Sequence, residues 1–174
     1  MTKKLLIIVA AIALASCDAG NGKNDIIGFM PGMKKADVHA LADSHKWKCE
    51  NDYPRRNFSR TEETCYTMSG QMRVVYAANM EGWPVSALVF GFNQDQRDPR
   101  LSLEIQAEEI STQYGKKPDN MTRDIRGDVD EVYWNLDNGN VLKLQTLNTL
   151  ILENQAIVRA DQEAGQRVNP VPKF

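Results

Sequence analysis

The chain has 174 residues, of which 42% are hydrophobic, 25% are charged and 7% are aromatic, and its formal net charge is −2 at pH 7. This length indicates one domain or two small ones, and the hydrophobic share is sufficient for a core, which excludes a wholly disordered chain. A net charge close to zero lacks the strong positive potential of nucleic-acid-binding proteins, so we expect no nucleic-acid partner.

The first 16 residues have the pattern of a secretory signal peptide. Lys3 and Lys4 are followed by an uncharged run, residues 5–14, which is too short for a transmembrane helix of about 20 residues. The end of the segment, Leu14-Ala15-Ser16-Cys17, resembles the lipobox of bacterial lipoproteins. The resemblance implies cleavage after residue 16 and lipid attachment at Cys17, with residues 17–25 as the lipidated cysteine and a flexible tether. An ordinary signal peptide followed by an incidental cysteine is the alternative.

Two or more acyl chains hold a protein stably on a membrane without a spanning helix. We therefore expect a protein attached to a bacterial membrane through an N-terminal lipid anchor and facing the periplasm. Asp18, directly after the cysteine, resembles the inner-membrane retention signal of enterobacterial lipoproteins. It favours the inner membrane, with the outer membrane as the alternative.

The first helix is predicted at residues 34–47. Four positions have the i, i+3, i+4, i+7 spacing of one helix face: Val38, Leu41, Ala42 and His45. On this face His45 is expected to be packed or half-buried, whereas His39, with Asp43 one turn further on, is expected at the surface. The two histidines lack the i, i+4 spacing with which a helix presents two ligands to one metal.

Cys49 and Cys65 remain once Cys17 is lipidated, and in an exported protein they predict one disulfide. The closed loop of about 16 residues gives roughly 3 kcal/mol of stability in the chain-entropy model. The sequence has no Cys-x-x-Cys motif and no second Cys or His pair at the spacing of a metal site. Free thiols are the alternative.

Four further residues are candidates for partner binding. Arg55, Arg56 and Phe58 lie in the loop between the cysteines, and Trp83 lies in a turn beside Pro84. A solvated charged surface is the simpler interpretation of the loop, and a binding loop is the alternative, because arginine and aromatic residues are enriched at interfaces. In contrast, Trp134 alternates with polar residues and is expected in the core.

The middle of the chain predicts a hairpin and a second helix. Residues 72–78 and 85–92 are rich in β-branched and aromatic side chains and predict an antiparallel pair, with a further strand at residues 64–68. The second helix is expected to begin near Asp98-Pro99 and to end at Gly115 in the left-handed conformation. Its apolar face consists of Leu103, Ala107, Ile110 and Tyr114.

The remaining residues predict three strands, at 131–136, 141–147 and 150–158. Asn138-Gly139 between the first two indicates a tight hairpin turn in which both residues have positive φ. Residues 165–174 are predicted to be a flexible tail. Together the elements predict one α+β domain, residues 26–164, with helices packed on one face of an antiparallel sheet. Its halves, 26–95 and 96–164, are interpreted as two divergent helix-plus-three-strand units.

Short motifs in these halves resemble known envelope lipoproteins. Residues 28–38 contain Gly-x-x-x-Gly-Met-x-x-x-x-Val before an amphipathic helix and the cysteine pair, and residues 114–118 read Tyr-Gly-Lys-Lys-Pro before the Trp-bearing strand at 132–134. These motifs are similar to the BamE (SmpA/OmlA) and β-lactamase-inhibitor-like lipoprotein group. The resemblance implies an α+β fold whose sheet or loops contact another protein. The BamE pattern comprises one compact unit, whereas this chain has a second half.

The sequence contains no Gly-x-Ser-x-Gly motif, phosphate loop or dinucleotide fingerprint. We therefore expect no cofactor, no metal and no enzymatic activity. The leading hypothesis is a membrane-anchored envelope lipoprotein that acts as a protein-binding or assembly accessory module, with a protein partner in the envelope. An inhibitor or immunity-type lipoprotein that blocks an exported enzyme is the alternative, and a periplasmic hydrolase using Asp or Glu is the third.

Overall fold

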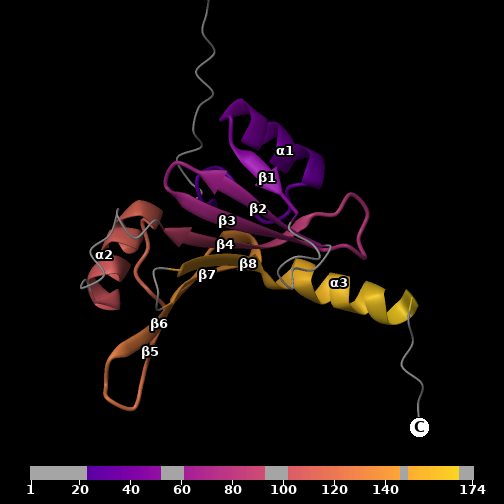
Figure 1. Ribbon diagram of the computed structural model, residues 1–174. Coiled ribbons are helices and arrows are strands. Elements are labelled where there is room, and N and C mark those ends of the chain that lie inside the picture. Colours follow the sequence, from indigo (N-terminus) through magenta and orange to yellow (C-terminus); the bar gives the residue numbers. More distant parts are fainter. Residues whose placement is uncertain (1–22, 52–60, 93–101, 146–148, 169–174) are drawn as a thin grey trace, which may run out of the picture.

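A computed structural model of the chain describes residues 23–51, 61–92, 102–145 and 149–168. Three α-helices, eight strands and a short 3₁₀ helix lie in these ranges (Figure 1). In chain order they are α1 (Lys35–Ser44), β1 (Lys48–Glu50), β2 (Glu62–Thr67), β3 (Gly70–Tyr76), β4 (Val85–Phe92), α2 (Leu103–Tyr114), β5 (Asn120–Arg123), β6 (Val129–Asn135), η2 (Asp137–Gly139), β7 (Asn140–Gln145), β8 (Thr149–Asn154) and α3 (Gln155–Val168).

All eight strands form one antiparallel sheet in the order β1-β2-β3-β4-β8-β7-β6-β5. The predicted α+β class with an antiparallel sheet is confirmed. Strands β4 and β8 join two halves at the centre of the sheet, and each half consists of a helix followed by four strands. Each half has one strand more than predicted, because β1 and β5 are short and polar and show no strand pattern in the sequence.

One face of the sheet forms the hydrophobic core. Two rows of aligned residues cross β3, β4, β8 and β7 and are almost completely buried: Met72, Phe90, Leu150 and Leu144, then Val74, Leu88, Leu152 and Leu142. The predicted apolar face of α2 belongs to the same core, as does Val38 of α1. Burying each such side chain stabilises the fold by about 1.5–3 kcal/mol, so this inner face dominates the stability.

The first helix is shorter than predicted, and the prediction for His45 is wrong. Helix α1 ends at Ser44, because the chain turns through Lys46, with φ of 58°, into β1. His45 therefore lies past the last turn and is exposed. Its ring stacks on that of Trp47, with a centroid distance of 4.4 Å. Trp47 also stacks on Phe29 at the edge of the core.

Two predicted turns and the predicted disulfide are confirmed. Asn138 and Gly139 have φ of 61° and 74° between β6 and β7, and Gly115 ends α2 with φ of 65°. Strands β3 and β4 form the predicted hairpin. The disulfide joins Cys49 of β1 to Cys65 of β2, which are directly paired in the sheet.

The end of the chain departs from the prediction, because the last strand stops at Asn154 and not at residue 158. The Asn154 Oδ1 atom accepts hydrogen bonds from the backbone N–H groups of Ala156 and Ile157, both at 3.1 Å, and so caps α3. Residues 165–168, which were predicted in the tail, continue this helix. Helix α3 is attached to the β3–β4 connection, where the Asn79 backbone N–H donates to Asp161 at 2.8 Å.

Candidate functional site

The side of the sheet opposite the core carries the candidate site. Side chains of consecutive strand residues alternate between the two faces, so every second residue points away from the core. One aligned row on this side crosses six strands and contains Thr64, Arg73, Val89, Ile151, Lys143 and Tyr133. We call this row and the neighbouring residues on the same side the open face, because the buried core residues of the same strands point to the opposite side.

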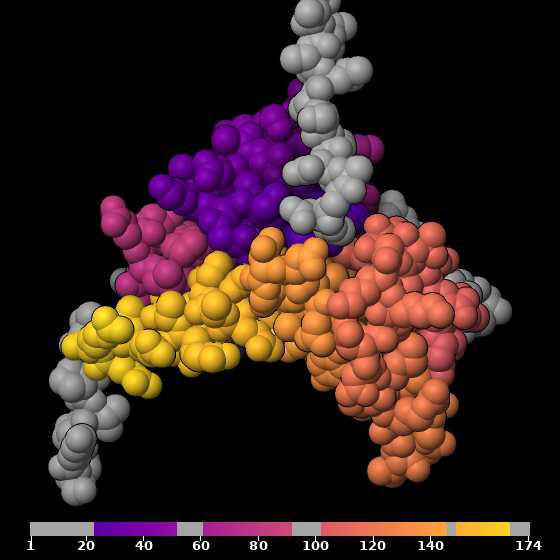
Figure 2. Space-filling model, turned by 180° about the vertical axis from the view of Figure 1, so that it is seen from behind, coloured from indigo at the N-terminus to yellow at the C-terminus, as the bar shows by residue number. Residues whose placement is uncertain are grey.

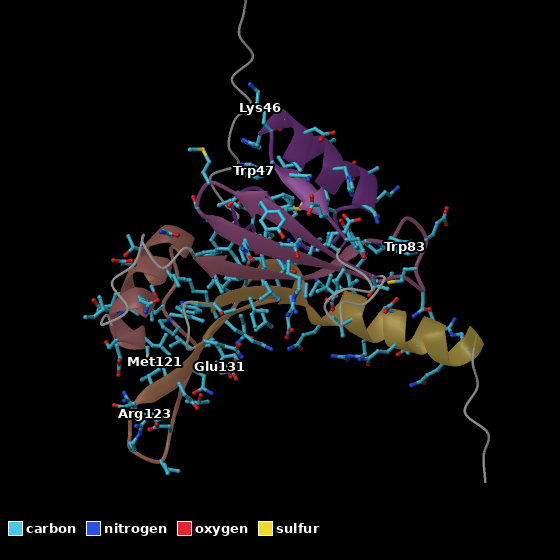
Figure 3. The ribbon with its side chains drawn as sticks, in the orientation of Figure 1. Lys46, Trp47, Trp83, Met121, Arg123 and Glu131 are labelled. Atoms are coloured by element: carbon cyan, nitrogen blue, oxygen red, sulfur yellow. A yellow bond between two sulfur atoms is a disulfide. The ribbon has the colours of Figure 1, made fainter. Side chains whose placement is uncertain are left out.

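The open face is hollowed. In Figure 2 a depression separates α3, in yellow, from the β5–β6 hairpin, in orange. Figure 3 shows Glu131 on this side of the strands, whereas Trp47 and α1 lie on the other side. The hollow on the open face therefore lies between two projecting elements.

The centre of the open face is apolar. Val89 of β4 and Ile151 of β8 are directly paired where the two halves of the sheet meet, and both are half-buried. Val75 and Ala87, paired in the next row, are also half-buried. These side chains do not belong to the core cluster, and together they form an apolar centre on this face.

The half of the open face on β6, β7 and β8 is a polar network. Glu131 accepts hydrogen bonds from the Tyr133 hydroxyl and, at 2.6 Å, from the Gln145 amide. The hydrogen bond to Glu131 raises the pKa of Tyr133 to about 12. The Lys143 Nζ atom lies 2.7 Å from a Glu153 carboxylate oxygen and 6.0 Å from the centre of the Tyr133 ring. These contacts hold the side chains of this half in fixed positions.

The half on β2, β3 and β4 is different, because it carries an uncompensated charge. Arg73 is exposed and has no hydrogen-bond or ion-pair partner within the described part of the chain. Beside it Thr64, Gln71, Val89 and Gly91 line a shallow hollow of about 190 Å³. Tyr66, aligned with Gln71, is 37% exposed.

A second polar cluster lies on the core side, beneath α1. Glu63 is 6% exposed and contacts Lys35 Nζ at 2.5 Å, His39 Nε2 at 2.8 Å and the Tyr76 hydroxyl at 3.1 Å. Burial by itself raises the pKa of Glu63, but the hydrogen bonds from Lys35 and His39 outweigh this and hold it below its ordinary value. Burial and the Glu63 charge raise the pKa of Tyr76. The cluster joins α1 to β2 and β3, so it has a structural role.

The structure describes one of the four predicted partner-binding residues. Trp83 lies in the β3–β4 connection, is 37% exposed, and has Lys35 Nζ 5.4 Å from its ring centre. Arg55, Arg56 and Phe58 lie outside the described residues, as does Cys17. His39 pairs with Glu63, not with its helix neighbour Asp43.

Sequence reasoning did not identify the open face. The available signal was the alternation within the predicted strands, since Val89 and Ile151 occupy positions between core residues. The alternation indicates which strand residues share a face of the sheet, but it does not show whether a helix covers that face.

The described residues contain no group of three or more His, Cys, Asp or Glu side chains that could hold a metal ion. Within the same residues, no helix combines the length and the apolar character needed to cross a bilayer. Comparisons of the chain with protein-family models, with curated proteins and with solved structures find no match.

Proposed function

We propose that this protein is a lipid-anchored bacterial envelope protein, not an enzyme, that binds another protein through the open face. One observation carries the proposal: this face combines an apolar centre with tyrosine, arginine and ion-paired side chains around it. Protein interfaces have this composition, with apolar and aromatic groups at the centre and polar groups at the rim.

The proposed location follows from the N-terminal sequence. The pattern of Leu14-Ala15-Ser16-Cys17 supports lipid attachment at Cys17, and Asp18 favours the inner membrane. The Cys49–Cys65 disulfide is in keeping with an oxidising compartment such as the periplasm. Mass spectrometry of the mature chain should find acylation and the loss of residues 1–16. A Cys17→Ser variant should keep its leader, and an unmodified mature wild-type chain would contradict this part of the proposal.

We also propose that the two halves of the domain are divergent copies of one unit, with their helices on the core side of the shared sheet. The identical element order, one helix and four strands, supports this. Joining two units through β4 and β8 gives a sheet broad enough to receive the surface of a folded partner.

An inhibitor or immunity-type role is the second candidate. Tyr66, Arg73 and Tyr133 on the open face favour it, because tyrosine and arginine are common at tight interfaces. In that case the bound partner would be an exported enzyme whose activity falls on binding. An assembly accessory module would leave the activity of its partner unchanged or raise it.

Photo-crosslinking in cells tests the proposal. A photoreactive residue is placed on the open face at Gln71 or Gln145 and, as matched controls, at the exposed positions Ala36 of α1 and Glu108 of α2. We expect one envelope protein to be captured from the open face and not from the helices. Equal capture from all four positions, or none from the open face, would reject the proposed binding surface.

A further inference from the structure

We propose that the open face contains a subsite for a carboxylate side chain, an Asp or Glu of the protein partner, formed by Arg73 and the hollow at Gly91. This inference depends on the proposed function, because it assigns the carboxylate to the bound protein. It specifies the chemistry of the partner surface: an acidic side chain next to an apolar one.

The charge of Arg73 supports a subsite for an anionic side chain. Among the described residues, the other cations in this part of the sheet are paired, Lys143 with Glu153 and Lys48 with Glu50. Arg73 has no such partner and is exposed. Since a guanidinium is always protonated, Arg73 presents a full positive charge and five N–H donors on an otherwise compensated surface.

The hollow beside Arg73 has room for a side chain of the partner. A Cβ atom added at Gly91 would have no heavy atom of the described residues within 4 Å, so the missing side chain leaves an opening directly beside Arg73. The hollow of about 190 Å³ is smaller than typical small-molecule sites of about 300–1,000 Å³, and its size suits a single side chain.

The groups that line the hollow suit a carboxylate side chain with an apolar neighbour. The planar fork of Arg73 matches the two oxygens of a carboxylate, and the Gln71 side-chain amide at the rim is a further donor. Val89 forms one wall and is paired with Ile151, so an apolar residue next to the acidic one would cover the centre of the open face. A single arginine in a chain of net charge −2 favours a carboxylate over a nucleic-acid backbone.

The subsite is tested by nuclear magnetic resonance with the full-length chain and blocked peptides. The probe is acetyl-Leu-Glu-Leu-amide, and the controls are acetyl-Leu-Gln-Leu-amide and acetyl-Leu-Gln-Leu with a free terminal carboxylate. The glutamate peptide should shift the Gly91 amide and the Arg73 Nε–H signals with millimolar affinity. Equal shifts from either control would overturn the assignment to an acidic side chain.

Matched variants locate the effect. Arg73→Gln removes the charge, and Gly91→Leu fills the hollow in open space without a positive φ. Arg73→Gln should abolish the shift of the Gly91 amide and Gly91→Leu that of the Arg73 Nε–H signal, whereas Arg126→Gln, at the β5–β6 turn, should leave both shifts unchanged. Persistence of the glutamate response in Arg73→Gln would overturn the proposal.

The photo-crosslinking experiment distinguishes failure of the carboxylate subsite from failure of the proposed function. With the photoreactive residue at Gln145, Arg73→Gln should weaken partner capture at least about tenfold, the scale of losing one charge-assisted interface contact. Unchanged capture would reject the carboxylate subsite and leave the proposed function intact. Absence of capture in the wild type would reject the proposed function, and the peptide titration would then show only whether Arg73 and the hollow bind a carboxylate side chain.

Discussion

The two faces of the sheet obey different rules, and adjacent residues of β6 show the contrast. Trp134 points into the core and is fully buried, whereas Tyr133 points to the open face and is half-buried among charged side chains. The inner face is apolar in nearly every row, because burial there stabilises the fold. The open face is free of that requirement, so its mixture of apolar and charged residues reflects a different constraint, which we propose is binding.

The largest expected effect comes from removing an aromatic side chain from the inner face, compared with removing its neighbour from the open face. Trp134→Ala should lower the free energy of unfolding by about 3–5 kcal/mol, because it removes a large buried side chain and leaves a cavity. Tyr133→Ala should cost no more than about 1 kcal/mol, because its surroundings are partly solvated. Urea unfolding of the two variants measures the difference. Equal losses would mean that the open face also supports the fold.

The disulfide distinguishes the two edges of the sheet. It joins β1 to β2, whereas the β5–β6 edge has no such bond among the described residues. Replacing Cys49 and Cys65 together with serine should cost about 3 kcal/mol, since the crosslink restricts the unfolded chain. Reductant should destabilise the wild type to the same degree in urea unfolding and leave the double variant unaffected. An unaffected wild type would contradict the assigned role.

Glu63 is a buried charged residue on the inner face, and it makes stability depend on pH. Its pKa is held below the ordinary value of 4.5 in the folded chain, so the charged form stabilises the fold above that pH. This contribution is lost as the pH falls through the folded-state value, because protonation removes the pairing with Lys35 and His39.

Glu63→Gln should therefore cost about 1–3 kcal/mol at neutral pH, because Lys35 and Tyr76 lose a charged partner. The variant should also lose less stability than the wild type when urea unfolding is followed to pH values well below 4.5. Parallel pH profiles of the two chains would show that another group causes the acid dependence.

The smallest expected effect compares two glycines in open space. In the part of the chain that the structure describes, no atom lies within 4 Å of a Cβ added at Gly139 or at Gly91, but Gly139 has φ of 74°. Gly139→Ala should cost about 1 kcal/mol through backbone strain in the β6–β7 turn. Gly91→Ala should change the melting temperature little. A larger loss of stability in Gly91→Ala than in Gly139→Ala would show that other side chains pack closely around Gly91 on the open face.

Local signals in the sequence predicted much of the fold. The alternation around Trp134, the Asn138-Gly139 turn and the terminal Gly115 all depend on neighbouring residues and were confirmed. The prediction of one strand over residues 150–158 is wrong after Asn154, because a short apolar run fits a strand as well as a helix face. The side chain of Asn154 caps α3 and so ends the strand there.

The candidate site could not be predicted in the same way. Val89 and Ile151 meet only because β4 pairs with β8, and these strands are about 60 residues apart in the chain. Their pairing depends on how the two halves join, which no local pattern contains. Likewise, Arg73 is notable because it lacks a partner among the described residues, and this is a property of the assembled sheet.

Hydroxyl-radical footprinting in native membranes tests the central claim most directly. Tyr66 and Tyr133 report on the open face, and Met68, which is 87% exposed at the β2–β3 turn, is the reference. We predict that both tyrosines are oxidised several-fold more slowly in membranes than in the purified chain, while Met68 reacts equally in the two. Equal tyrosine oxidation in both preparations would contradict a partner on the open face.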